Sequence, residues 1–355
     1  MRYDRPLFFM KNRVRRVYPG GALFAGFYGD GSTDGMYPEE WIASPVKALN
    51  KGSTDPKEGV SRLRETGEYL DDVLKEHADE ICGGRPLDVL VKTLDSAVRL
   101  PAQAHPDREF SEKYFGSVHG KAESWLILDT RPGACVYFGF KEKMTEEELI
   151  SVIKRSETER DAWETVMNKV PVKPGDVWFV PAKTPHAIGA GCLILETQEP
   201  TDFTIQPEYY CADYRLDESE MYLGLSLEEA VKCFDLSAYG DAAVASGRVE
   251  PKTLIDSGRF NLEELIGFDR TPCFATFRRT LAAGAKTRFD PGEAPFVCVV
   301  TDGGGEIVCG GHTDKLKKGD YFLMPAAAPE ATVTAGNGGL TFVVCCPPEA
   351  ALPPR

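Results

Sequence analysis

The chain contains the stretch Lys173-Pro-Gly-Asp-Val-Trp-Phe-Val-Pro-Ala-Lys-Thr-Pro-His186 and, later, the related stretch Lys318-Gly-Asp-Tyr-Phe-Leu-Met-Pro-Ala-Ala-Ala-Pro-Glu330. In both stretches, Gly-Asp precedes four apolar or aromatic residues and a Pro-Ala pair. Gly-Asp is typical of a turn and the apolar run of a short strand, which the proline ends because it cannot donate to a strand ladder. This internal repeat predicts two copies of one β unit.

Length and composition indicate an ordinary globular protein. The chain has 355 residues, and 42% of them are hydrophobic, which predicts about two domains and excludes disorder as the main state. The net charge is −14, and such an acidic surface repels nucleic acids and anionic membranes. No apolar run approaches the ~18 residues of a membrane helix. The expected partner is therefore a small molecule, and the oligomeric state stays open.

The cysteines indicate a reducing compartment. Ten cysteines are scattered along the chain without a Cys-x-x-Cys pair. A disulfide-stabilised protein would be shorter and denser in cysteine. We therefore predict free thiols and a cytoplasmic protein.

The spacing of apolar residues predicts β regions interrupted by helices. Apolar residues at helical intervals predict helices over about 53–82 and 144–170, the second with Thr145 as its N-cap. A stretch rich in Gly, Ala and Ser, 236–260, is expected to be a connector. The predicted organisation is an N-terminal domain over 1–235, this connector, and a C-terminal domain over 261–355.

Four polar residues are candidate metal ligands. Gln103 and His105 are two positions apart, and on a strand such residues point to the same side. Glu123 precedes an apolar strand, and His186 ends the first copy of the repeat. Each residue alone is typical of an ordinary core or surface position. Together, two imidazoles, a carboxylate and an amide oxygen suit Zn²⁺, with another divalent metal as the alternative.

The repeated stretch resembles the second signature of the cupin β-barrel. More closely, the chain resembles the short bacterial form of class I mannose-6-phosphate isomerases. The motifs that carry this resemblance are Val91-Lys-Thr-Leu-Asp95, Gln103-Ala-His-Pro-Asp107, Gly120-Lys-Ala-Glu-Ser-Trp125, the run from Val172 to Gly189, and Leu195-Glu-Thr-Gln198.

This resemblance implies a mainly β fold of two cupin (jelly-roll) barrels with a small helical insertion. It also implies zinc ligands at the matching Gln103, His105, Glu123 and His186. The second copy of the repeat has Glu330 where the first has His186, and His312 is the one histidine near it. We therefore predict that the C-terminal barrel is metal-free and structural.

The resemblance further implies that mannose 6-phosphate and fructose 6-phosphate, or related sugars, are interconverted through an enediol(ate). This reaction needs a cation to hold the developing oxyanion and a base to move a proton. Lys121 is the predicted oxyanion or phosphate contact, with a solvated lysine as the alternative. Glu196 is either the base or a structural inward carboxylate. Lys92 either binds substrate or faces solvent at a strand edge.

One position departs from the family pattern. Gln206 stands where the family has an active-site arginine, and glutamine supplies no fixed positive charge for a phosphate or an enediolate. Arg215 is predicted to substitute for it if the chain turns back. The departure keeps two alternatives open. One is a cupin of other chemistry, such as a non-haem iron oxygenase, and the other is a sugar-binding cupin without turnover.

Overall fold

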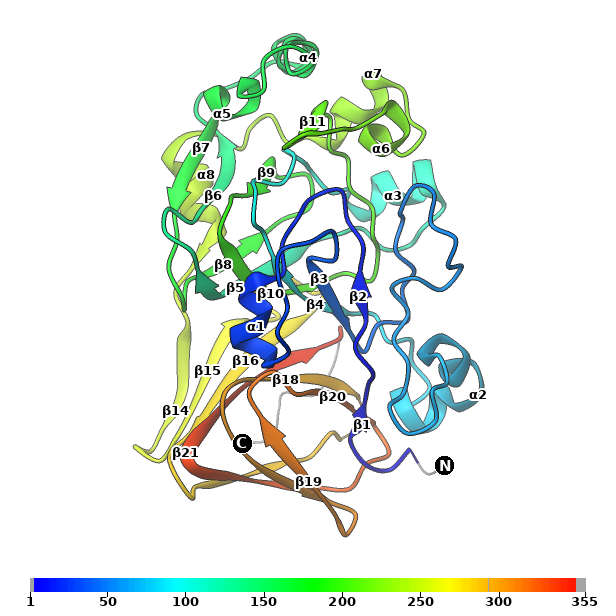
Figure 1. The fold of residues 1–355 in the computed structure, drawn as a ribbon, viewed down its shortest axis with the longest axis vertical. Coiled ribbons are helices and arrows are strands. Elements are labelled where there is room, and N and C mark those ends of the chain that lie inside the picture. Colours follow the sequence, from blue (N-terminus) through cyan, green and yellow to red (C-terminus); the bar gives the residue numbers. More distant parts are fainter. Residues whose placement is uncertain (1–2, 293, 349–355) are drawn as a thin grey trace.

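The computed structural model describes residues 3–292 and 294–348, most of which belong to two β units (Figure 1). The first unit is built on a seven-stranded antiparallel sheet in the order β13-β8-β5-β10-β4-β3-β2. These strands are β2 (Arg13–Val14), β3 (Glu39–Ile42), β4 (Leu90–Asp95), β5 (Glu123–Thr130), β8 (Val177–Val180), β10 (Cys192–Gln198) and β13 (Arg248–Val249). A three-stranded sheet packs across from it and comprises β6 (Cys135–Phe140), β7 (Met167–Pro171) and β9 (His186–Ile188).

The second unit is a nine-stranded antiparallel sheet that forms the lower part of the molecule in Figure 1. Its strands are β1 (Leu7–Phe8), β14 (Lys252–Asp256), β15 (Phe260–Ile266), β16 (Ala275–Leu281), β17 (Lys286–Phe289), β18 (Phe296–Cys309), β19 (His312–Lys317), β20 (Tyr321–Met324) and β21 (Ala331–Cys346). The N-terminal strand β1 pairs with β20, so the start of the chain joins the C-terminal sheet.

The seven-stranded sheet is buried on both faces. On β10, Ile194 packs into the core of the first unit, whereas its neighbour Leu195 packs against the second unit. Successive strand residues point to opposite faces. Glu196 therefore shares the inner face with Ile194. On β4 the same alternation places Lys92 on the side of Leu94, which also belongs to the inner core.

This topology shows whether Lys92 points into the first unit or faces solvent at a strand edge. Strand β4 lies between β10 and β3, so it is an interior strand of the sheet. The Lys92 side chain is only 6% exposed. It points into the first unit, and the solvent-facing edge position does not occur.

Helices cover the ends and sides of the first unit. They are α1 (Ala22–Tyr28), α2 (Leu70–Cys82), α3 (Arg108–Phe115), α4 (Glu146–Arg155), α5 (Ala162–Val166), α6 (Glu218–Tyr222), α7 (Leu227–Ala230) and α8 (Gly240–Gly247), with a short 3-10 turn at Val231–Cys233. Thr145 caps α4 as predicted, in a capping box with Glu148. No helix in the described part of the chain is long and apolar enough to cross a membrane.

The structure corrects both predicted helical segments. Of 53–82, only Leu70–Cys82 is helical. The preceding residues form turns, in which Gly59 and Gly67 adopt φ values of 90° and 74° that a helix does not allow. Of 144–170, α4 and α5 are helical, but Met167–Pro171 is strand β7, which pairs with β6. Apolar spacing alone did not separate a short helix from the strand that follows it.

The predicted connector, 236–260, contains regular structure. It carries α8, and its strands β13 and β14 pair with β8 and β15, respectively. The segment therefore contributes one strand to each sheet. The domain boundaries remain a prediction, and residues 349–355 of the predicted C-terminal domain lie outside the described residues.

Candidate active site

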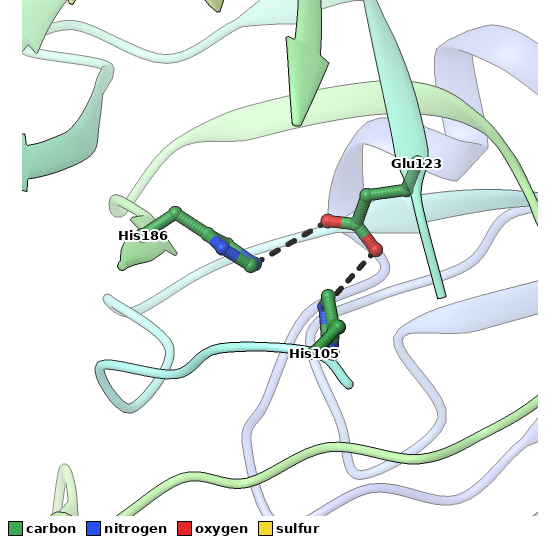
Figure 2. A group of neighbouring side chains, drawn as sticks. All are labelled: His105, Glu123 and His186. Carbon is green, nitrogen blue, oxygen red and sulfur yellow. Dashed lines mark ion pairs between the residues drawn. The ribbon is translucent and has the colours of Figure 1, made fainter. Parts of the chain in front are cut away.

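Three side chains from separate segments converge inside the first unit (Figure 2). Glu123 begins β5, His186 begins β9, and His105 lies in the segment between β4 and α3. Their ligand atoms all lie within 4.8 Å of one another, and all three residues are buried. Glu123 Oε2 is 3.1 Å from His105 Nε2, and Glu123 Oε1 is 3.4 Å from His186 Nε2.

Both imidazoles are oriented through Nδ1. This atom lies 3.0 Å from the Phe203 carbonyl in His105 and 2.8 Å from the Thr184 carbonyl in His186. A carbonyl only accepts, so Nδ1 carries the proton and Nε2 keeps its lone pair. Nε2 of His186 is buried and has no hydrogen-bond partner in the described residues. These donors fit a divalent metal ion.

The protonation states also suit a metal. Burial, with the charge of Lys121, lowers the pKa of His105 to about 3, so its imidazole is neutral at pH 7. Burial alone would raise the pKa of Glu123, but Lys121 and His105 outweigh it and hold this pKa well below its ordinary value. Trp125 Nε1 also donates to Glu123 Oε1 at 3.0 Å, which fixes the carboxylate. A neutral imidazole and an ionised carboxylate are the ligand forms of these residues.

Gln103 lies next to this group. Its backbone N–H donates to the His186 carbonyl, and the His186 N–H donates to the Gln103 carbonyl, both at 2.9 Å. The Gln103 side chain lines the same cavity as His105 and Glu123. The structure thus brings the four predicted ligands to one place.

Two lysines and a second carboxylate adjoin the group. The Lys121 ammonium contacts Glu123 Oε2 and lies 2.8 Å from His105 Nε2. Glu196 Oε1 lies 3.6 Å from Lys121 Nζ and 3.4 Å from Lys92 Nζ. Burial, together with the negative charge of Glu123, raises the pKa of Glu196 to about 8. Lys121 itself is buried, so the alternative of a solvated lysine does not occur.

A cavity of about 300 Å³ opens above these residues. Its floor carries the charged groups just described. Its walls include Leu94, Leu100 and Ile188, and its rim includes residues of the 49–51 segment and of α6. This space suits a ligand with several polar groups, because its lining combines charged and apolar residues.

Arg16 and Glu39 are among the residues of this cavity that sequence reasoning missed. Arg16 Nε lies 2.9 Å from Glu39 Oε1, and Glu39 Oε2 lies 3.6 Å from Lys92 Nζ. Glu39 also accepts from Trp41 Nε1 at 2.7 Å. The acidic pair Glu39-Glu40, directly before Trp41 and Ile42, was an available signal. Arg16 gave none, because it stands in a run of surface-like basic residues.

Gln206, which stands at the position of the family arginine, and Arg215, its predicted substitute, lie in different places in the structure. Gln206 lines the cavity, and its side-chain amide donates to the Glu220 carbonyl at 3.2 Å. Arg215 does not line the cavity. It lies on β12 (Tyr214–Arg215), which pairs only with β11 (Tyr210–Cys211), and its 55% exposed side chain bonds to Glu157 at 2.6 Å. This hairpin holds Arg215 away from the cavity, so its position gives no support to the predicted substitution for the missing arginine.

The corresponding positions of the second unit differ from the first. His312 lies on β19, and its Nδ1 is 3.0 Å from Arg5 Nη1. Glu330 is half exposed and lies 3.5 Å from Arg288 Nη1. Neither residue takes part in a group of potential ligands among the described residues. A metal-free second unit remains a prediction.

Comparison with known proteins identifies the family to which the chain belongs. The mannose-6-phosphate isomerase of Streptococcus mutans serotype c is 31% identical over 327 residues, which cover 90% of this chain and 92% of the relative. The chain belongs to the mannose-6-phosphate isomerase family. Mannose-6-phosphate isomerase ManA of Bacillus subtilis is 29% identical over 259 residues, which cover 71% of this chain and 74% of the relative. The predicted membership of this family is confirmed, although no model of a protein family matches the sequence.

Solved structures of mannose-6-phosphate isomerases share the fold. The crystal structure of the enzyme from Bacillus subtilis has a TM-score of 0.75 at 24% identity and covers 96% of this chain and 99% of that chain. A point mutant of phosphomannose isomerase from Salmonella typhimurium has a TM-score of 0.70 at 16% identity, covering 95% of this chain and 99% of that chain. The predicted mainly β fold of cupin barrels is confirmed.

Proposed function

We propose that this protein is a metal-dependent aldose–ketose isomerase that interconverts mannose 6-phosphate and fructose 6-phosphate. One observation carries the proposal: the buried His105–Glu123–His186 group adjoins a cavity whose lining includes Glu196, Lys121 and Lys92. Membership of the mannose-6-phosphate isomerase family supports this substrate pair. The ten cysteines of the chain are all free and buried, which supports the cytoplasm as the location.

We assign four metal ligands, namely Gln103, His105, Glu123 and His186. Two imidazoles, a carboxylate and an amide oxygen suit Zn²⁺. When bound, the ion would act as a Lewis acid toward the sugar oxygens at C1 and C2. Gln103 as a fourth protein ligand favours an isomerase over an oxygenase, because oxygenases keep more coordination positions open.

The protein's own residues would handle the proton and the developing charge. Glu196 is the proposed base, which removes the proton from C2 of the open-chain aldose and returns it to C1. The proton of the O2 hydroxyl moves to O1 in the same conversion, so the number of protons is unchanged. Lys121 would donate to the enediolate oxygen, and preorganised donors of this kind are among the largest catalytic contributions. Lys92 would hold Glu196 in place from the other side.

An isomerase assay tests the proposal. Purified protein loaded with Zn²⁺ is supplied with mannose 6-phosphate, free mannose and other aldoses, beside a His105→Ala control. Turnover of mannose 6-phosphate that disappears in the control is the expected result. Absence of turnover of any aldose at full metal occupancy would overturn the proposed activity. It would favour the alternative of a cupin that binds sugar without converting it.

A further inference from the structure

The cations around the cavity differ in how firmly they are paired. In the described residues, the side chains concerned are Arg16, Lys51, Lys92 and Lys121. Lys92 and Lys121 are almost fully buried and lie against Glu39, Glu196 and Glu123. The Lys51 side chain is 54% exposed and pairs with Asp217, which is 44% exposed.

Arg16 is already engaged on most of its donors. Its Nη1 and Nη2 lie 3.1 and 2.9 Å from the two carboxylate oxygens of Asp202, and Nε bonds to Glu39. Nη1 also donates to Asn50 Oδ1 at 3.2 Å. The Arg16 side chain is 12% exposed and lies between two carboxylates. Its charge is therefore largely compensated, and removing it from these partners is costly.

The same arginine holds the segment that carries Lys51. Asp202 accepts from the Leu49 backbone N–H at 2.7 Å, and the Asn50 amide donates to the Arg15 carbonyl at 2.8 Å. Residues 49 and 50 are thus fixed from both sides at the rim of the cavity. Lys51 follows directly, and its ammonium crosses the rim to Asp217, the N-cap of α6.

We propose that Lys51 is the residue that binds the phosphate of the sugar phosphate, exchanging Asp217 for it when substrate enters. This inference rests on the proposed function. An exposed ion pair is weak, so its cation can change partners at little cost. A phosphate monoester carries a charge of about −1.5 to −2 at pH 7 and outcompetes a single half-exposed carboxylate. The reacting carbons would lie at the floor and the phosphate at the rim.

Substitution of Lys51 tests this assignment. Lys51→Met is expected to raise the KM for mannose 6-phosphate about tenfold or more, with kcat changed less than about threefold, because a charge-assisted bond remote from the reacting carbons is lost. Lys47→Met is the matched control. Lys47 lies in the same segment, is exposed and does not line the cavity, so its removal should leave KM unchanged. Equal KM values for the two variants would overturn the assignment.

Asp217→Asn distinguishes two roles of Lys51, namely binding of the phosphate and a purely structural ion pair with Asp217 across the rim. Asparagine keeps the N-cap acceptor of α6 but removes the competing charge. The KM for mannose 6-phosphate should then stay the same or fall. If Asp217→Asn raises KM as much as Lys51→Met does, the pair serves to close the rim, and Lys51 is not the phosphate ligand.

A binding measurement keeps this test independent of turnover. Mannose 6-phosphate and inorganic phosphate are titrated calorimetrically into the metal-loaded wild type and Lys51→Met. Weaker binding of both ligands by the variant is expected even if the wild type turns over no sugar, in which case only the proposed activity fails. Equal affinities in the two proteins, or no binding to the wild type, would overturn the role of Lys51.

Discussion

Arg16 Nη2 lies 2.9 Å from Asp202 Oδ1, although the two residues are 186 positions apart in the sequence. Arg16 follows β2, and Asp202 follows β10. Their ion pair therefore joins the N-terminal segment to the chain leaving the central sheet. The pair forms one wall of the cavity and fixes the rim at Leu49 and Asn50.

Two arginines offer a matched comparison. Arg16→Met should destabilise the protein by about 3–5 kcal/mol, because it leaves Asp202 and Glu39 as buried charges without their main partner. Arg215→Met should change stability by less than about 0.5 kcal/mol and activity by less than about twofold, because Arg215 is exposed and outside the cavity. Urea unfolding measures the stability of each variant, and the isomerase assay measures its activity. A large loss of activity in Arg215→Met would restore its predicted catalytic role.

Metal binding should depend on the buried trio. His105→Ala is expected to lower metal affinity by at least ~100-fold, because one of the protein ligands is lost. His119→Ala is the control, since His119 pairs with Asp88 at 3.3 Å and lies outside the trio. The metal content of the two variants after dialysis, measured by mass spectrometry, tests this prediction. Full occupancy in His105→Ala would exclude this residue as a ligand.

Glu196 should matter for the chemical step and not for the metal. Glu196→Gln is expected to lower kcat by about 10²–10⁴-fold, the usual range for loss of a general base. The variant should keep its metal content and thermal midpoint near those of the wild type. Glu218→Gln, an exposed change on α6, serves as the control. Wild-type kcat in Glu196→Gln would show that this carboxylate is only an inward structural residue.

Glu39 should make stability depend on pH. Burial alone would raise the pKa of Glu39, but the charges of Arg16 and Lys92 outweigh burial and hold this pKa below its ordinary value. The resulting stabilisation is present above the unfolded-state pKa of about 4.3 and is lost as pH falls below it. Glu39→Gln should therefore cost about 3 kcal/mol at pH 7.

The pH series gives the sign of this effect. Urea unfolding of the wild type and Glu39→Gln at pH 7, 5 and 4 should show a difference in free energy that narrows as the pH falls. A difference that widens on acidification would mean that Glu39 is protonated in the folded protein.

The candidate ligands could be picked out from the sequence because their signals are local. Gln103 and His105 share a short extended segment, and His186 closes a repeated turn–strand–proline unit. The inward direction of Lys92 and Glu196 could not be predicted with certainty. A charged residue in an apolar strand faces either a cavity or solvent, and only the position of β4 and β10 inside the sheet distinguishes these.

The sequence by itself indicated the repeated β unit, the family, and four candidate ligands that lie close together in the structure. Only the tertiary structure decided that Arg215 points outward and that Arg16 and Lys51 line the cavity. The physical reason is the range of the contacts. Turns, strands and ligand spacing follow from neighbouring residues, whereas the pairing of Arg16 with Asp202 exists only once distant strands have packed together.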